Sequence, residues 1–76
     1  MKPERTPTKM GSVADVGLAI RGRRKELKLT QGDLAAVAGT SLRFVSEVER
    51  GKETARIGGV MRLLAALGLE IELATR

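Results

Sequence analysis

Two short helices joined by a tight turn, between Thr30 and Gly51, are the feature that most constrains the fold of this sequence. Thr30 followed three residues later by Asp33 is a capping-box pattern, which marks the start of a helix. Two helical turns later, Gly39 suits the left-handed conformation in which many helices end. We expect the inward face of this helix to consist of Leu34, Ala35, Val37 and Ala38.

The second helix of the pair starts at Thr40 or Ser41, continues to about Arg50 and ends at Gly51. Its expected inward residues are Phe44, Val45 and Val48. Its third position holds Phe44, where the preceding helix has a carboxylate, so its positive end stays available to phosphate. A helix fixed by a short turn in this way places a few side-chain tips in the major groove of DNA.

Composition narrows the classes of function. The 76 residues carry 14 Lys and Arg against 9 Asp and Glu, a net charge of +5, which favours an anionic partner such as nucleic acid. The chain has no Cys and no His, so we expect no metal, no cofactor and no enzymatic activity. A single aromatic residue disfavours the stacking platforms of single-strand binders and favours duplex DNA. With no long apolar run and no signal-peptide core, the chain is expected to be cytoplasmic and not to bind membranes.

The chain before the paired helices predicts an arm and one further helix. Residues 1–11 are polar and basic without apolar periodicity, and are expected to form a flexible arm. The arm touches phosphates or a minor groove, or has no role. A capping-box pattern and a mostly helical apolar face predict a helix over 12–27. Its apolar positions are Val13, Val16, Leu18, Ile20 and Leu27.

The chain after the paired helices predicts a last helix and a strand. The helix is expected over 54–67, ended by Gly68, and the helical domain therefore spans 12–68. Its apolar positions are Ile57, Val60, Met61, Leu64 and Leu67. Residues 69–76 begin with strict alternation, in which Glu70 and Glu72 separate three apolar residues, as in a half-buried strand. These apolar residues are Leu69, Ile71 and Leu73.

One strand cannot satisfy its own backbone hydrogen bonds, and the sequence predicts no second strand. The simplest partner for this strand is the same segment of another copy, paired antiparallel about a two-fold axis in a homodimer. The alternative is a frayed tail.

The sequence resembles that of the Cro/cI-type helix-turn-helix family, also called the XRE family, over about residues 13–68. The matches are Leu29-Thr30-Gln31, Leu34-Ala35, Ala38-Gly39, Ser41, Val45-Ser46 and Glu49-Arg50-Gly51-Lys52. The added strand and the run from Arg43 to Lys52 resemble a narrower group, the HipB-type antitoxins, in which such strands join two subunits. The resemblance implies an all-α, lambda-repressor-like bundle of four to five helices, with a short C-terminal β-strand that pairs across the homodimer.

The same resemblance implies roles for residues outside the base-reading face. Gln31 would bond a DNA phosphate at the first turn of its helix. Arg50 and Lys52 match the phosphate-binding turn of the family. Arg24 and Glu49 would pair across two helices in a partly buried, bidentate ion pair, which makes them structural.

Five residues are expected to point into the groove: Ser41, Leu42, Arg43, Ser46 and Glu47. Arg43 would bond guanine O6 and N7 together, or lie on a phosphate. Leu42 would contact a thymine methyl group or act as a wedge at the groove edge. Glu47 would accept from cytosine N4, or form a salt link that orients Arg43 four residues earlier.

These features favour a homodimeric, sequence-specific repressor that binds a palindromic operator in double-stranded DNA. Within this class, the resemblance favours an antitoxin that represses its own operon and neutralises a HipA-like kinase toxin. The alternatives are a stand-alone phage or host repressor and a protein-interaction module that has lost DNA binding.

Overall fold

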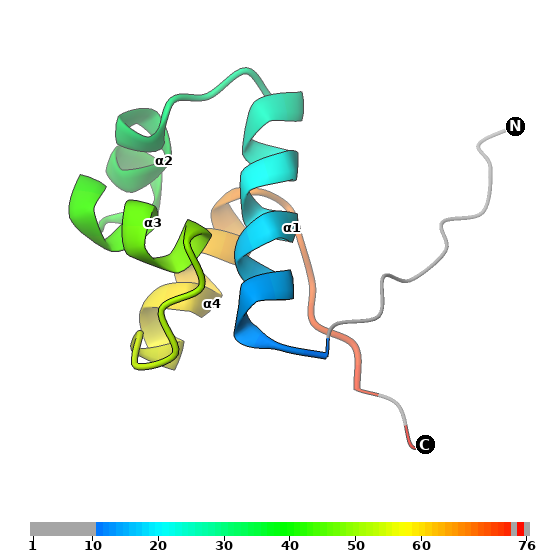
Figure 1. The fold of residues 1–76 in the computed structure, drawn as a ribbon. Coiled ribbons are helices and arrows are strands. Elements are labelled where there is room, and N and C mark those ends of the chain that lie inside the picture. Colours follow the sequence, from blue (N-terminus) through cyan, green and yellow to red (C-terminus); the bar gives the residue numbers. More distant parts are fainter. Residues whose placement is uncertain (1–10, 74, 76) are drawn as a thin grey trace, which may run out of the picture.

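Four helices form the part of the chain that the computed structural model describes, which is residues 11–73 and 75. They are α1 (Val13–Glu26), α2 (Gln31–Ala38), α3 (Leu42–Glu49) and α4 (Ile57–Ala66). In Figure 1, α2 and α3 lie beside α1, and α4 lies below α3. The predicted all-helical bundle is confirmed, with four helices among the described residues. Residues 1–10, nearly all of the expected basic arm, lie outside them.

Local capping fixes the turn between α2 and α3. The Thr30 hydroxyl accepts from the Asp33 N–H at 3.0 Å, and the Asp33 carboxylate accepts from the Thr30 N–H at 2.9 Å, which closes the predicted capping box. Gly39 ends α2 with a φ of 72°, a left-handed conformation that favours glycine. Ser41, not Thr40, then caps α3 by accepting from the Phe44 N–H at 3.0 Å.

The core lies where all four helices meet. α3 packs against both α1 and α2, and α2 also packs against α4. The buried apolar residues are Ile20, Leu34, Ala35, Ala38, Val45, Val48, Val60, Leu63, Leu64 and Leu67. Phe44 is half-buried and packs against this core. Within residues 11–73, no helix combines the length and the apolar character that crossing a lipid bilayer requires.

The predicted inward face of α4 is partly wrong. The helix begins at Ile57, not at Thr54, because Arg56 takes an extended conformation and serves as its N-cap. Ile57 and Met61 are exposed, and Leu63, which was not among the expected core residues, is fully buried. The buried stripe is Val60, Leu63, Leu64 and Leu67, which keeps the i, i+3, i+4, i+7 spacing on a face rotated from the expected one.

Four other apolar residues are also exposed against expectation: Val13 and Leu18 of α1, Leu27, which follows α1, and Val37 of α2. Helical spacing places Val37 away from the stripe formed by Leu34, Ala35 and Ala38. α2 has only two turns, and the neighbouring helices cover one side of it.

The C-terminal segment follows α4 after a helix end that is closed by backbone hydrogen bonds. Gly68 has a φ of 71°, and the Leu69 N–H donates to the Leu64 carbonyl at 2.8 Å. Residues 69–73 form neither a helix nor a strand in the single chain, and Ile71 and Leu73 are exposed. Residues 74 and 76 of the expected strand lie outside the described residues, and pairing with a second copy stays a prediction.

A glycine sets the distance between α1 and α3. Gly17 is buried, and a Cβ built on it would overlap the Val48 carbonyl oxygen and lie 3.0 Å from the Glu49 carbonyl oxygen. These are backbone atoms of the last turn of α3, so they cannot rotate away as a side chain would. Only glycine lets the two helices approach this closely.

Replacing Gly17 with Ala should lower the free energy of unfolding by about 1–3 kcal/mol, because overpacking against backbone outweighs the gain in helix propensity. Gly22→Ala is the matched control in α1, since a Cβ there meets nothing within 4 Å. The control should raise stability by about 0.5–1 kcal/mol. Urea unfolding of both variants checks this, and equal stabilisation of the two would contradict the assigned contact.

Candidate nucleic-acid interface

One face of α3 is buried and the other is open. Val45 and Val48 are fully buried, and they fix the rotation of the helix about its axis. Of the residues expected on the outer face, Ser41, Leu42 and Arg43 are exposed, while Ser46 and Glu47 are half-buried. The structure therefore brings all five to the side of α3 that faces away from the core.

A carboxylate joins two cations on this face. Glu47 accepts from Arg43 Nε at 3.2 Å and from Lys52 Nζ at 3.3 Å. The hydrogen bond from Lys52, together with that from Arg43, outweighs desolvation and lowers the pKa of the Glu47 carboxyl. This geometry matches the alternative in which Glu47 orients Arg43. The Arg43 side chain remains 86% exposed, so the pair leaves its guanidinium open to a ligand.

Ser41 has a structural task besides any contact with a ligand. Its hydroxyl oxygen accepts from the Phe44 N–H and so caps α3. The hydroxyl hydrogen stays free to donate, because this cap uses only the oxygen.

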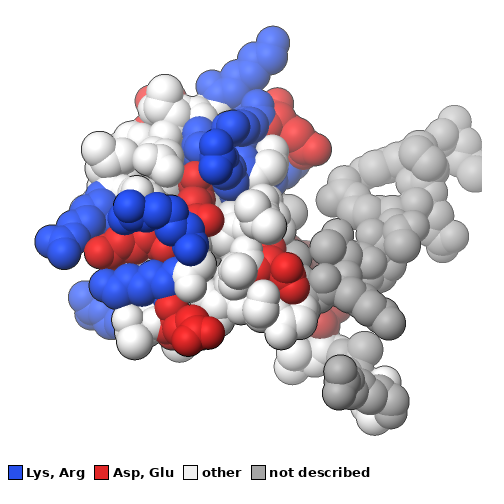
Figure 2. All heavy atoms as spheres, in the orientation of Figure 1, with Lys and Arg blue, Asp and Glu red and all other residues white. Residues whose placement is uncertain are grey.

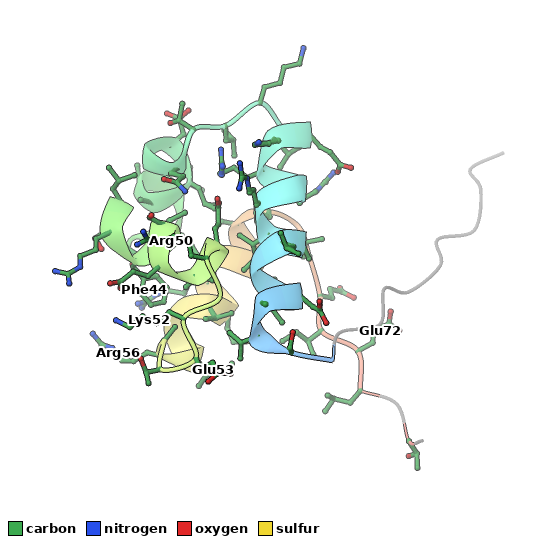
Figure 3. The ribbon with its side chains drawn as sticks, in the orientation of Figure 1. Phe44, Arg50, Lys52, Glu53, Arg56 and Glu72 are labelled. Carbon is green, nitrogen blue, oxygen red and sulfur yellow. The ribbon has the colours of Figure 1, made fainter. Side chains whose placement is uncertain are left out.

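The turn after α3 presents the next cations. Gly51 has a φ of 85°, and its N–H donates to the Val48 carbonyl at 2.9 Å. The Lys52 N–H donates to the Glu47 carbonyl at 3.1 Å, which closes the end of α3. Figure 3 shows Arg50 and Lys52 on the same side of the molecule.

Gln31, the first residue of α2, lies beside the end of α3. Its Nε2 donates to the Glu49 carboxylate at 3.1 Å. The side-chain amide nitrogen is therefore engaged inside the protein. The expected phosphate contact of Gln31 stays a prediction. Because the side-chain amide binds Glu49, the backbone N–H of Gln31 is the donor that remains for a phosphate.

The Arg24 and Glu49 side chains form a bidentate ion pair. Arg24 Nε and Nη2 donate to the two carboxylate oxygens at 2.7 and 3.0 Å. The Arg24 and Glu49 side chains are only 9% and 2% exposed, so the pair is more deeply buried than the sequence suggested. Arg24 Nη1 also donates to the Leu29 carbonyl at 2.7 Å, which ties the loop before α2 to the same group.

The environment of this pair favours the charged form of both groups. Burial raises the pKa of the Glu49 carboxyl, but hydrogen bonds from Arg24 and Gln31 and the positive charges of Arg24 and Arg21 together lower it. The hydrogen bond to Glu49 raises the pKa of Arg24. The pair is therefore ionic at neutral pH.

Positive charge gathers over α3 and the segment that follows it. Figure 2 shows Lys and Arg atoms grouped on the side where α3 lies, with carboxylates between them, and a second group over the C-terminal end of α1. Sequence reasoning missed two cations, Arg56 and Arg62, which line a pocket with Thr40 and Phe44. No motif marks them, because their approach to α3 depends on how α4 packs.

Comparisons with known proteins agree with this architecture. The sequence model of a family described as Helix-turn-helix matches residues 20–73, so the chain belongs to the helix-turn-helix family, of the XRE type. The uncharacterized HTH-type transcriptional regulator y4mF of Sinorhizobium fredii (strain NBRC 101917 / NGR234) is 48% identical over 60 residues, which cover 79% of each chain. The chain is thus a relative of transcriptional regulators, a family that is not enzymatic.

Solved structures share the fold. A HipB-O4 20mer complex and a HipA-HipB-O2-O3 complex each match with a TM-score of 0.83 and 22% identity, over 90% of this chain and 96% of theirs. The restriction-modification controller protein C.AhdI from Aeromonas hydrophila matches with a TM-score of 0.69 and 29% identity, over 76% of this chain and 88% of its own. At 22% identity, the HipB likeness establishes the fold alone.

Replacing Glu49 with Gln should lower the free energy of unfolding by about 3 kcal/mol at neutral pH, because Arg24 would keep a buried charge without its partner. The folded-state pKa of Glu49 is lowered, so the unfolded chain takes up this proton first on acidification. The stabilisation is therefore complete above roughly pH 4.3, the usual Glu pKa, and is lost as the pH falls through the folded-state value.

Urea unfolding from neutral to acidic pH measures both effects. The loss of stability on acidification should be smaller in Glu49→Gln than in the wild type. Glu26→Gln is the control, because Glu26 pairs with Arg23 at the surface and should contribute less than about 1 kcal/mol. Identical acid dependence in wild type and Glu49→Gln would contradict the assigned role.

Proposed function

We propose that this chain is a sequence-specific DNA-binding transcriptional repressor that acts as a homodimer on a palindromic operator. The observation that carries the proposal is the fixed presentation of Arg43, which stands on α3 with its opposite face buried and its guanidinium 86% exposed. Arg50 and Lys52 follow on the same side and would bind phosphates beside the groove. Membership in a family of transcriptional regulators supports the same function.

Base reading is assigned to the outer face of α3, namely Ser41, Leu42, Arg43, Ser46 and Glu47. Arg43 has the planar fork that bonds guanine O6 and N7 together, and Glu47 holds its Nε. Glu47 is thus a positioning residue for Arg43.

The proposed homodimer forms through residues 69–73, where the apolar side chains of Ile71 and Leu73 are exposed. A second copy would supply the antiparallel strand that the single chain lacks and would cover these side chains. Two recognition helices would then enter successive major grooves about 34 Å apart, which requires a palindromic site.

Within this function, we favour an antitoxin that also neutralises a HipA-like toxin. The support is the HipB-like fold, since one of the matched structures is a HipA-HipB-O2-O3 complex. An adjacent gene for a kinase-like toxin, whose growth arrest this chain relieves, would establish this role. Lack of such a gene would favour a stand-alone repressor, and lack of any DNA binding would favour an interaction module.

Arg43→Ala should weaken binding to the selected site by about 1–3 kcal/mol, roughly 5- to 150-fold, and relax the base preference at one position in each half-site. Selection of duplexes from a random library, followed by titration, supplies the site and the affinities. Arg50→Ala is the matched control, which should weaken binding to selected and random duplexes alike.

The two variants separate a base contact from a phosphate contact. Equal loss on both duplexes in Arg43→Ala would assign Arg43 to a phosphate. Failure of the selection to enrich any palindrome with the wild-type protein would overturn the proposed function itself.

Replacing Ile71 and Leu73 together with Asp should shift the protein toward monomer, because the paired segment would bury unpartnered charges. Sedimentation velocity at several concentrations measures the shift, and affinity for the selected palindrome should fall with it. Glu72→Gln, on the alternate face of the segment, is the control and should leave the dimer intact. A wild-type protein that is monomeric at every concentration would overturn the proposed pairing.

A further inference from the structure

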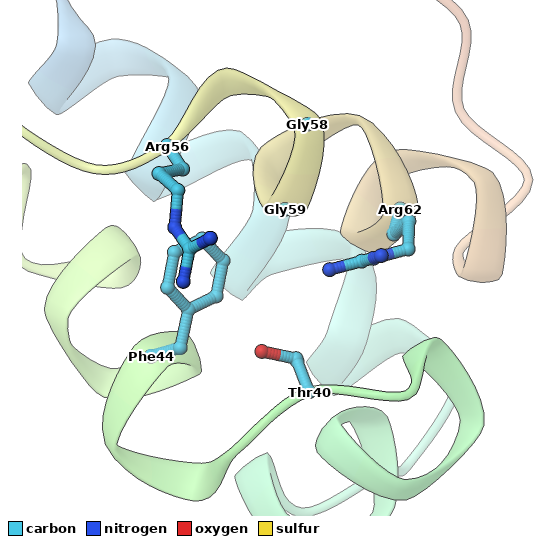
Figure 4. Close-up of a pocket in the computed structure, with 6 residues that line it drawn as sticks. All are labelled: Thr40, Phe44, Arg56, Gly58, Gly59 and Arg62. Carbon is cyan, nitrogen blue, oxygen red and sulfur yellow. The ribbon is translucent and has the colours of Figure 1, made fainter.

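A small pocket opens between α3 and α4, beside the proposed base-reading face. Its volume is about 260 Å³, and it is lined by Thr40, Phe44, Arg56, Gly58, Gly59 and Arg62. Figure 4 shows the Arg56 and Arg62 guanidinium groups and the Thr40 hydroxyl pointing toward the space beside Phe44. Three side chains, one from the turn before α3 and two from α4 and its N-cap, therefore direct hydrogen-bond donors into one small volume.

The lining carries positive charge without a carboxylate. Among residues 11–73, no Asp or Glu forms an ion pair with Arg56 or Arg62, whereas Arg23, Arg24, Arg43 and Lys52 each have such a partner. Each guanidinium presents up to five N–H donors and no acceptor, and a hydroxyl completes the set. A group of this kind selects an oxyanion, and guanidinium is the preferred side-chain group for phosphate.

Packing holds the pocket in shape. A Cβ built on Gly59 would lie 2.5 Å from Phe44 Cζ, so the ring rests directly on the backbone of α4. The Phe44 ring and the Arg56 side chain both line the pocket. The volume lies below the roughly 300–1,000 Å³ of pockets for drug-sized ligands, which suits a small anion.

The position of the pocket indicates which molecule would supply the anion. Thr40 belongs to the turn between α2 and α3, and Phe44 to α3 itself, so the pocket adjoins the proposed recognition helix. Figure 3 shows Arg56 on the same side of the molecule as Arg50 and Lys52. A duplex that receives α3 would therefore bring its sugar-phosphate backbone toward this pocket.

We propose that the pocket formed by Thr40, Phe44, Arg56 and Arg62 binds a phosphodiester group of the DNA backbone, next to the groove that α3 enters. This site rests on the proposed function and extends it, because the contact ties α4 to the duplex. It supplies affinity and fixes the angle of α3, and it carries no base information.

Salt dependence of duplex binding tests the site. Each neutralised phosphate contributes about 0.9 to the slope of log affinity against log salt concentration. Arg62→Gln should reduce this slope by about 0.9 on a mixed-sequence duplex. Lys25→Gln removes the same charge from an exposed position of α1 outside the pocket, and it should leave the slope unchanged.

A second measurement reads the pocket directly. Amide resonances of Gly58 and Gly59 should shift when the duplex is added, and the shifts should be lost in Arg62→Gln. The same amide shifts are measured with inorganic phosphate in place of DNA. Saturable shifts with inorganic phosphate, combined with an unchanged DNA salt slope in Arg62→Gln, would assign the pocket to a free anion and overturn the DNA contact.

The outcomes distinguish the site from the function. Equal slopes for Arg62→Gln and Lys25→Gln, with wild-type binding to the selected palindrome intact, would overturn the pocket alone. Absence of any duplex binding by the wild-type protein would overturn both. Matched melting temperatures of the two variants exclude loss of folding as the cause.

Discussion

The buried ion pair between Arg24 and Glu49 is the interaction on which the rest of the structure depends. It joins the last turn of α1 to the end of α3, and the same two side chains bind the Leu29 carbonyl and the Gln31 amide. Replacement of such a pair by apolar residues is often neutral or stabilising, so its value here is geometric. Apolar contacts have no direction, whereas a guanidinium fork accepts a carboxylate in one arrangement. The pair therefore fixes where α3 stands.

Two glycines complete this placement by deciding how closely other helices approach α3. Gly17 lets α1 touch the backbone of the last turn of α3, and Gly59 lets α4 receive the Phe44 ring. α2 holds α3 through the short turn at Gly39. With three neighbours in place, one face of α3 is left open, and that face carries Arg43. The rigidity of the site thus comes from packing that lies wholly behind it.

Capping and helix-end rules correctly predicted the features that depend on contacts between residues close in sequence. The capping box of Thr30 and Asp33 and the left-handed Gly39 appear in the structure as the sequence indicated, because each involves atoms only a few residues apart. The sequence left the cap of α3 open between Thr40 and Ser41, and the structure assigns it to Ser41.

Features that depend on packing between helices could not be predicted in this way. Ile57, Met61 and Val37 are apolar at helical spacing yet exposed, since which stripe is covered depends on the neighbouring helix. The pocket between α3 and α4 could not be predicted for the same reason, because Arg56 and Arg62 come near Phe44 only when α4 packs against α3. Among the site residues, Arg43 and Glu47 were expected, but the link from Glu47 to Lys52 was not.

The proposed homodimer also has to satisfy an energetic condition. A two-stranded ribbon alone is marginal in water, so pairing of residues 69–73 needs apolar burial as well as backbone hydrogen bonds. The chain supplies apolar surface in a groove of about 300 Å³, where Ile71 lies with the exposed Val13 and Ile57. Lys52 and Glu53 also line this groove. A second copy seated on the apolar part of this groove would therefore bury surface that so small a domain leaves uncovered.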